Sequence, residues 1–119
     1  MNRKVLEAVG IDYQEGLKRF SGMKAMYEKY LICFLSDGHF KESFEAFQQN
    51  DYQTLALAAH TCKGLAGNLS MTELYAQYAI VVQRLRDQNY VKIDEAMCRA
   101  QKIYKTIYVA IQAEKEKNT

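Results

Sequence analysis

The sequence contains no proline in 119 residues, and this absence narrows the folds open to the chain. Proline breaks helices because it lacks a backbone N–H and because its ring clashes with the preceding turn. Clusters of turn-forming residues are few, and residues that favour helices are abundant, namely Ala, Leu, Lys, Glu, Gln and Met. These features together predict an all-helical protein.

The length suits a single domain over residues 1–119 with one hydrophobic core. Hydrophobic residues make up 49% of the chain, which favours a globular fold over disorder. The 16 basic and 14 acidic residues are mixed, so no basic block indicates a nucleic-acid partner. No apolar run approaches the ~20 residues that cross a bilayer, and the N-terminal MNRKVLEAVG lacks a signal-peptide core. We therefore expect a cytoplasmic protein that does not enter a membrane.

Apolar residues recur every three or four positions, which is typical of amphipathic helices. Long amphipathic helices with short connections predict an antiparallel, up-down four-helix bundle. The expected helical segments cover residues 2–9, 12–20, 23–35, 39–50, 51–69, 70–87 and 91–113.

Polar residues at the segment boundaries predict where the helices begin. Asp12 and Ser21 are expected to cap the second and third segments, and Asn50 or Asp51 the central one. Ser70 to Glu73 reads as an S-x-x-E capping box for the next helix. The tail EKEKNT, residues 114–119, is expected to fray.

The three cysteines are Cys33, Cys62 and Cys98. They are an odd number, lie far apart and sit in apolar helical patterns, so we expect reduced, buried thiols.

The central segment, residues 51–69, carries a histidine and two glycines inside an Ala/Leu-rich helical run. Each interior glycine costs about 0.5–1 kcal/mol relative to alanine, so the pair requires a reason. With His60 at zero on a helical wheel, Lys63 lies at about −60°, Gly64 at about +40° and Gly67 at about −20°. Ala56 falls on the same stripe, one turn before His60.

The large apolar side chains of this helix centre on the side opposite His60, so the imidazole is expected to face water. A lone helical histidine is more often structural than reactive, but a surface histidine of that kind leaves both glycines unexplained. An exposed neutral imidazole is a nucleophile, and a lysine one turn away attracts an anion. A phosphoryl group meets both requirements. The apolar stripe comprises Leu55, Ala58, Cys62, Leu65, Ala66 and Leu69.

The run HTCKGLAGNL, from His60 to Leu69, resembles the motif of histidine-containing phosphotransfer (HPt) domains of two-component phosphorelays. That motif is an H-x-x-K-G core within a longer H-T-x-K-G-x-A-G-N-L run, and every fixed position is matched. The resemblance implies a four-helix bundle with one or two smaller N-terminal helices. It also implies that His60 carries the phosphoryl group on Nε2, that Lys63 stabilises it and that Gly64 leaves space for it.

The resemblance further implies partners, which are receiver domains of response regulators, a hybrid histidine kinase, or both. Ala56, Leu57 and Gly67 are expected to let the partner's surface come close. The chain needs no cofactor of its own, because Mg²⁺ would belong to the receiver. We expect a monomer.

Many members of the family place a glutamine on the following helix, opposite the histidine. Counting without gaps puts Val82 at that position, with Gln83 adjacent, so either a one-residue shift restores the contact or the contact is missing. Arg86, one turn further on, is expected to supplement Lys63.

Other chemistry fits the sequence less well. His60 and Cys62 point about 160° apart on a helix, so one metal ion cannot bind both. The chain has no Gly-rich phosphate loop, so we expect a phosphoryl carrier that is not an ATP-dependent enzyme. An alternative is an interaction module that docks receivers and carries no phosphate.

Overall fold

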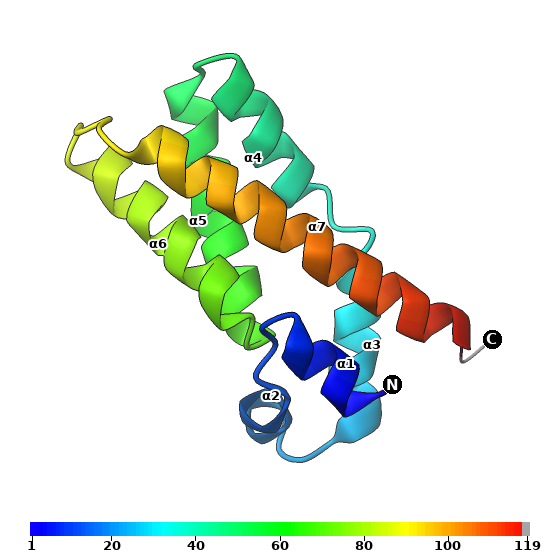
Figure 1. The fold of residues 1–119 in the computed structure, drawn as a ribbon. Coiled ribbons are helices and arrows are strands. Elements are labelled where there is room, and N and C mark those ends of the chain that lie inside the picture. Colours follow the sequence, from blue (N-terminus) through cyan, green and yellow to red (C-terminus); the bar gives the residue numbers. More distant parts are fainter. Residues whose placement is uncertain (118–119) are drawn as a thin grey trace.

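The computed structural model describes residues 1–117, and within that range the chain is all-helical and contains no strand, as the composition predicted (Figure 1). One isolated bridge joins Ile11 to Met71. The helices, in chain order, are α1 (Arg3–Ala8), α2 (Tyr13–Arg19), α3 (Lys24–Phe34), α4 (His39–Gln48), α5 (Tyr52–Asn68), α6 (Thr72–Arg86) and α7 (Ile93–Lys117).

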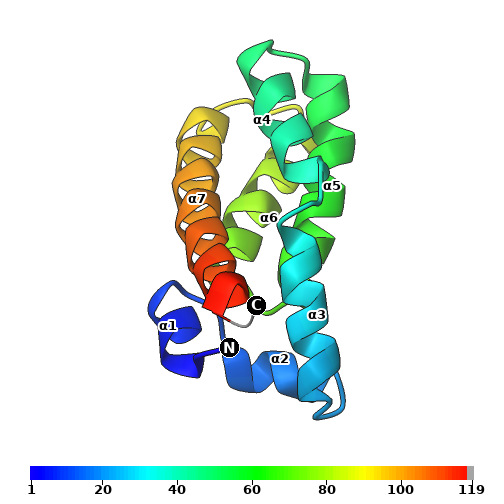
Figure 2. The same ribbon diagram turned by 90° about the vertical axis from the view of Figure 1, so that its right-hand side faces the viewer.

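Helix α5 packs against α4 on one side and α6 on the other, and α6 packs against α7 (Figure 1). Helices α3 and α4 follow one another along the length of α7 (Figure 2). The short helix α1 contacts the C-terminal part of α7, and α2 lies at the same end of the molecule (Figure 2). These neighbours together cover one face of α5, and the opposite face is left exposed.

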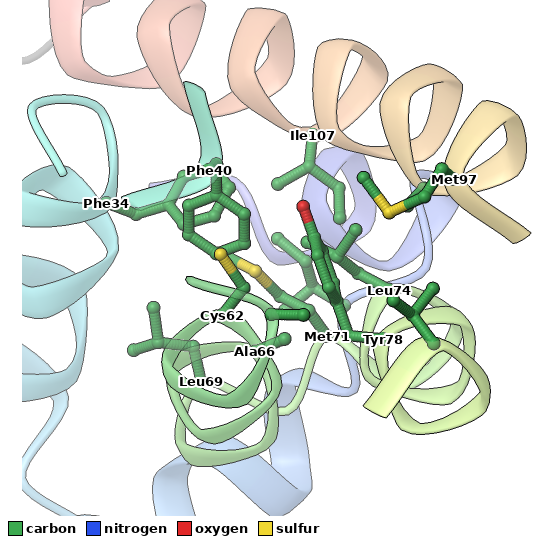
Figure 3. Packing of buried hydrophobic residues seen from close by; sticks show 14 of the residues in the cluster. Phe34, Phe40, Cys62, Ala66, Leu69, Met71, Leu74, Tyr78, Met97 and Ile107 are labelled. Atoms are coloured by element: carbon green, nitrogen blue, oxygen red, sulfur yellow. The ribbon is translucent and has the colours of Figure 1, made fainter. Parts of the chain in front are cut away.

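The hydrophobic core is one cluster with members from α1 through α7, and Figure 3 shows the part where side chains of α4, α5, α6 and α7 meet. Fully burying a large apolar side chain contributes about 1.5–3 kcal/mol, so this cluster accounts for much of the stability. The hydroxyl groups of Ser43 and Tyr78 are buried within it and bond to each other at 2.7 Å. Labelled members in Figure 3 include Phe40, Cys62, Ala66, Leu74, Tyr78, Met97 and Ile107.

Two of the predicted N-caps are confirmed. The Asp12 carboxylate accepts a hydrogen bond from the Glu15 amide, and the Asp51 carboxylate accepts one from the Thr54 amide. Hydrogen bonding from Thr54, first through its side chain and then through its backbone amide, lowers the pKa of Asp51, because it favours the charged carboxylate.

Two other predicted caps, Ser21 and the capping box at Ser70, are wrong. Ser21 has φ 55° and Ser70 has φ 58°, which is the left-handed conformation that ends the preceding helix. The amide of Met71 then donates to the carbonyl of Ala66, which closes a Schellman motif at the end of α5. Met23 and Met71 consequently occupy the N-cap positions of α3 and α6, without a side-chain cap.

The C-terminal tail is helical through Lys117, so the prediction of fraying is wrong for residues 114–117, while 118–119 lie outside the described residues. Glu114 is only 2% exposed. Its carboxylate accepts hydrogen bonds from the Asn2 amide and the Lys117 ammonium, and these bonds lower its pKa. Contacts with the N-terminus therefore extend α7 beyond the point where its apolar spacing ends. At its other end α7 begins at Ile93, two residues later than predicted.

Cys62 is buried as predicted, and burial raises the pKa of its thiol to about 12. Cys33 and Cys98 are exposed, so the prediction of buried thiols is wrong for both. Each lies off the apolar stripe of its helix, α3 or α7, and so faces outward.

The N-terminal helices hold the C-terminal end of α5. The Tyr27 hydroxyl donates to the Leu69 carbonyl at 2.8 Å, and the Asp12 amide donates to the Ser70 carbonyl at 2.9 Å. Gly16 permits this arrangement, because a Cβ there would overlap the Tyr27 ring. Among residues 1–117, no helix has both the length and the apolar character needed to span a membrane.

Candidate functional site

Helix α5 divides into a buried and an exposed face, as the helical wheel predicted. Leu55, Ala58, Cys62 and Ala66 are buried, and Leu69 just after the helix is buried as well. Leu65 is half-buried, which places it at the edge of the predicted apolar stripe.

His60 lies on the exposed face of α5. Within residues 1–117, no hydrogen bond or ion pair involves its imidazole. Both ring nitrogens are therefore open to solvent or to a docking molecule. An imidazole without a protein partner is free to act as a nucleophile.

Lys63 is one turn from His60 and is half-buried. No carboxylate in the described part of the chain forms an ion pair with it. Its Nζ lies 5.8 Å from the centre of the Tyr75 ring, within the range of a cation–π interaction. The charge of Lys63 is thus held near the exposed face without being neutralised by an acidic side chain.

The two glycines of α5 have different surroundings. A Cβ built on Gly64 would meet no other atom within 4 Å, so the chain's own packing gives no reason for a glycine there. A Cβ on Gly67 would lie 3.1 Å from Cδ2 of Tyr75, which is a tight contact. Gly67 is therefore explained by the approach of α6, while its predicted contact with a partner stays a prediction. The separate prediction that Gly64 leaves space for a phosphoryl group also stays a prediction.

A hollow of about 390 Å³ adjoins the exposed face of α5. Arg19 of α2 lies at this hollow and pairs with Glu15 at 3.2 Å. The sequence reasoning missed both Arg19 and Tyr75, because only the packing of α2 and α6 against the end of α5 brings them there. The lining comprises Lys63, Gly64, Gly67, Asn68 and Tyr75 together with residues of the 70–72 turn, Ala66, Glu15 and Arg19.

Helix α6 runs antiparallel to α5, in a register fixed by the Gly67–Tyr75 contact at one end and the Tyr52–Tyr90 ring stack at the other. By this register Val82 is level with His60. Val82 is only 9% exposed and belongs to the core cluster. An apolar side chain therefore stands where many HPt domains place glutamine.

Gln83 does not take the place of that glutamine. Its side-chain amide donates to the Asp87 carboxylate at 3.1 Å on its own helix, and Gln83 lines a groove between α6 and α7. The prediction of a partner-binding Gln83 at the His60 face is not supported by this position, because it lies about 100° around α6 from Val82. Arg86 is exposed and lies within about 40° of Val82 on the same wheel, so it remains on the side of α6 next to α5.

The turn of α5 before His60 is apolar. Leu57 is 71% exposed, and Ala56 is half-buried beside it. A leucine this exposed next to an exposed imidazole suits contact with a partner's apolar surface. The structure thus brings together His60, Lys63, Gly64, Ala56 and Leu57 on one side of one helix.

Comparisons of the chain with protein-family models, with curated proteins and with solved structures find no match.

Among the residues described, no group of three or more His, Cys, Asp and Glu side chains is arranged to hold a metal ion. His60 and Cys62 lie on opposite faces of α5, one exposed and one buried, as their spacing predicted. A function for the exposed face is therefore inferred from the chemistry of its side chains.

Proposed function

We propose that this protein is a phosphorelay intermediate of the HPt type, which carries a phosphoryl group on His60. The observation that carries the proposal is the position of His60, Lys63 and Gly64 on one exposed face of α5, with open space at Gly64. The phosphoryl group is exchanged with the aspartate of a receiver domain, either of a response regulator or of a hybrid histidine kinase.

The transfer step is a displacement at phosphorus. The lone pair on Nε2 of the neutral His60 ring forms a P–N bond while the P–O bond of the receiver's aspartyl phosphate breaks. The aspartate leaves as a carboxylate, and Nδ1 of His60 keeps its proton. Transfer in the opposite direction reverses these bond changes. Mg²⁺ is supplied by the receiver, since phosphoryl transfer depends on charge neutralisation of this kind.

Lys63 and Gly64 have distinct roles in this proposal. The Lys63 ammonium stabilises the negative charge on the phosphoryl oxygens, which is worth more once a docked partner excludes water. Gly64 leaves room for those oxygens beside the imidazole. Leu57 and Ala56 contact the receiver, and Arg86 adds positive charge at the far end of the same face.

We also propose that α4 to α7 form the antiparallel up-down four-helix bundle of the HPt family, with α1 to α3 as an N-terminal addition. The packing of each of these four helices against the next along the chain supports this arrangement. The protein is expected to act as a cytoplasmic monomer that neither binds ATP nor needs a cofactor of its own.

The proposal is tested by incubating the protein with a receiver domain that has been phosphorylated with radiolabelled acetyl phosphate in the presence of Mg²⁺. We expect label to appear on this protein in an acid-labile, base-stable form and to be absent from the His60→Gln variant. Complex formation without transfer of label would instead support a docking module that carries no phosphate. Neither complex nor label, across the receivers of the same organism, would contradict both functions.

A further inference from the structure

We infer that Tyr75 is a positioning residue that holds the Lys63 ammonium at the His60 face, and that residue 67 is glycine in order to admit the Tyr75 ring. This inference rests on the proposed function for its consequence in phosphotransfer. The arrangement of Lys63, Gly67 and Tyr75 is a separate, structural claim. It can be measured on the protein without phosphate.

The geometry joins the three positions in a row. Gly67 is one turn beyond Lys63 on α5, so both lie on the same side of that helix. The Tyr75 ring reaches this side from α6, with Cδ2 and Cε2 at 3.1 and 3.3 Å from the place of a Cβ on Gly67. The same ring lies 5.8 Å from Lys63 Nζ. One aromatic ring therefore lies beside both Gly67 and the Lys63 ammonium.

The ring limits where the ammonium can go. A lysine side chain on an exposed helix samples many rotamers, and fixing one of them costs entropy. The negative face of an aromatic ring favours rotamers that keep the ammonium close to it. Because Lys63 has no acidic partner in the described part of the chain, Tyr75 is the contact that selects its orientation.

Packing alone explains the tyrosine at position 75 less well than a contact with Lys63 does. The side chain is 41% exposed, so its ring does not fill the core. A smaller apolar residue would satisfy the half-exposed position and would not require a glycine opposite, which in a helix costs up to about 0.5–1 kcal/mol relative to alanine.

The structural part is tested by NMR on protein with isotope-labelled lysine. The Lys63 Hε protons are expected upfield of exposed lysines, because the ring current of Tyr75 shields them. Tyr75→Phe should keep this shift and Tyr75→Leu should remove it. Tyr108→Leu is the control, since Tyr108 lies on α7 and its ring packs against Tyr104 of the same helix. An unchanged Lys63 shift in Tyr75→Leu would overturn the inference.

The role of Gly67 is tested by a matched pair of alanine substitutions on α5. Gly67→Ala should displace the ring and alter the Lys63 shift, because its Cβ would press on Tyr75. Gly64→Ala should leave the shift as it is, because its Cβ meets nothing within 4 Å. If both substitutions, or neither, change the shift, the ring does not depend on the glycine at position 67.

The consequence for transfer is tested by single-turnover rates from a phosphorylated receiver. Tyr75→Leu should slow transfer about two- to fivefold, the size expected for a partly exposed cation–π contact, and Tyr75→Phe should restore the rate. In a Lys63→Ala background, Tyr75→Leu should have no further effect. If Tyr75→Leu slowed transfer equally in the wild-type and Lys63→Ala backgrounds, Tyr75 would not act through Lys63. Absence of transfer in the wild type would contradict the proposed function alone, because the Lys63 shift still decides whether Tyr75 holds the ammonium.

Discussion

The regions around His39 and His60 contain the same three residue types, yet within residues 1–117 only the His39 imidazole has a hydrogen-bond partner. Each histidine is exposed on a helix, with a lysine and a glycine nearby. Gly38 and Lys41 accompany His39 at the start of α4, just as Gly64 and Lys63 accompany His60 in the middle of α5.

Spacing and partners separate the two regions. Nδ1 of His39 lies 2.8 Å from the Asp37 carboxylate, and the same oxygen accepts a hydrogen bond from the His39 amide. Lys41 follows His39 by two residues, which puts the two side chains about 160° apart. His60 has no such acidic partner among the residues described, and its lysine lies about 60° away. Composition near a histidine therefore indicates little until the helical spacing is considered.

The largest effect on phosphotransfer is expected from substituting His60, and none is expected from substituting His39. His60→Gln should abolish phosphate uptake from a phosphorylated receiver, whereas His39→Gln should take up phosphate like the wild type. Acid-labile label on the purified proteins measures this difference. Because His60 is exposed, its substitution should change the free energy of unfolding by no more than about 0.5 kcal/mol. Label retained by His60→Gln would show that another residue is the acceptor.

The next largest effect concerns the lysines. Lys63→Ala should slow transfer about ten- to a hundredfold, each factor of ten being about 1.4 kcal/mol of lost transition-state stabilisation. Lys63→Arg should recover part of the rate, because charge is kept while the donor geometry changes. Lys41→Ala is the control and should transfer at the wild-type rate in a rapid-quench assay. Wild-type speed with weakened docking in Lys63→Ala would make Lys63 a partner contact.

The glycines give an intermediate effect on rate and a separate effect on stability. Gly64→Gln should slow transfer about tenfold by filling the space beside the imidazole, and Gly64→Ala should slow it less. Gly64→Ala should also stabilise the protein by up to about 1 kcal/mol, because an interior helical glycine is replaced. Gly38→Gln is the matched control, since a Cβ at Gly38 also meets nothing within 4 Å. Equal transfer rates in all these variants, measured beside urea unfolding curves, would remove the steric explanation for Gly64.

The smallest effect on transfer is expected at Asp37. Asp37→Ala removes the acceptor for the His39 amide and should lower the free energy of unfolding by about 1 kcal/mol, as for the loss of a helix cap. Phosphotransfer should not change. Urea unfolding and the transfer assay together measure both outcomes, and a loss of transfer with unchanged stability would give the His39 region a functional role that its geometry does not suggest.

Helix existence was predictable from periodicity, but helix starts were predictable only where the cap residue had no other role. Asp12 and Asp51 cap their helices as predicted. Ser21 and Ser70 have the residue type of a cap, but each follows a helix end and adopts positive φ to complete the Schellman motif. Five helices, α1, α2, α4, α5 and α6, end with such a left-handed residue. After α2 and α5, the next helix starts one or two residues later than the serine indicated.

The candidate site was predictable as far as it lies on one helix. The wheel of α5 correctly placed His60 away from the core. It could not anticipate the packing role of Gly67, because the ring beside Gly67 belongs to Tyr75 on another helix. Arg19 was missed for the same reason, since α2 is separated from α5 by two intervening helices in the sequence. Patterns within single helices therefore could not predict the contacts that residues of other helices make with the candidate site.

The bonds from Tyr27 to the Leu69 carbonyl and from Asp12 to the Ser70 carbonyl bear on how the molecule opens in solution. Elements joined by buried hydrogen bonds exchange their amide protons in common cooperative units. The amides of Asp12 and Met71, distant in the sequence, should therefore exchange with deuterium at matching rates. Tyr27→Phe should accelerate both together, because the turn after α5 would lose the hydroxyl that holds it. Residues near the N-terminus thus partly determine how often the C-terminal end of α5 opens locally.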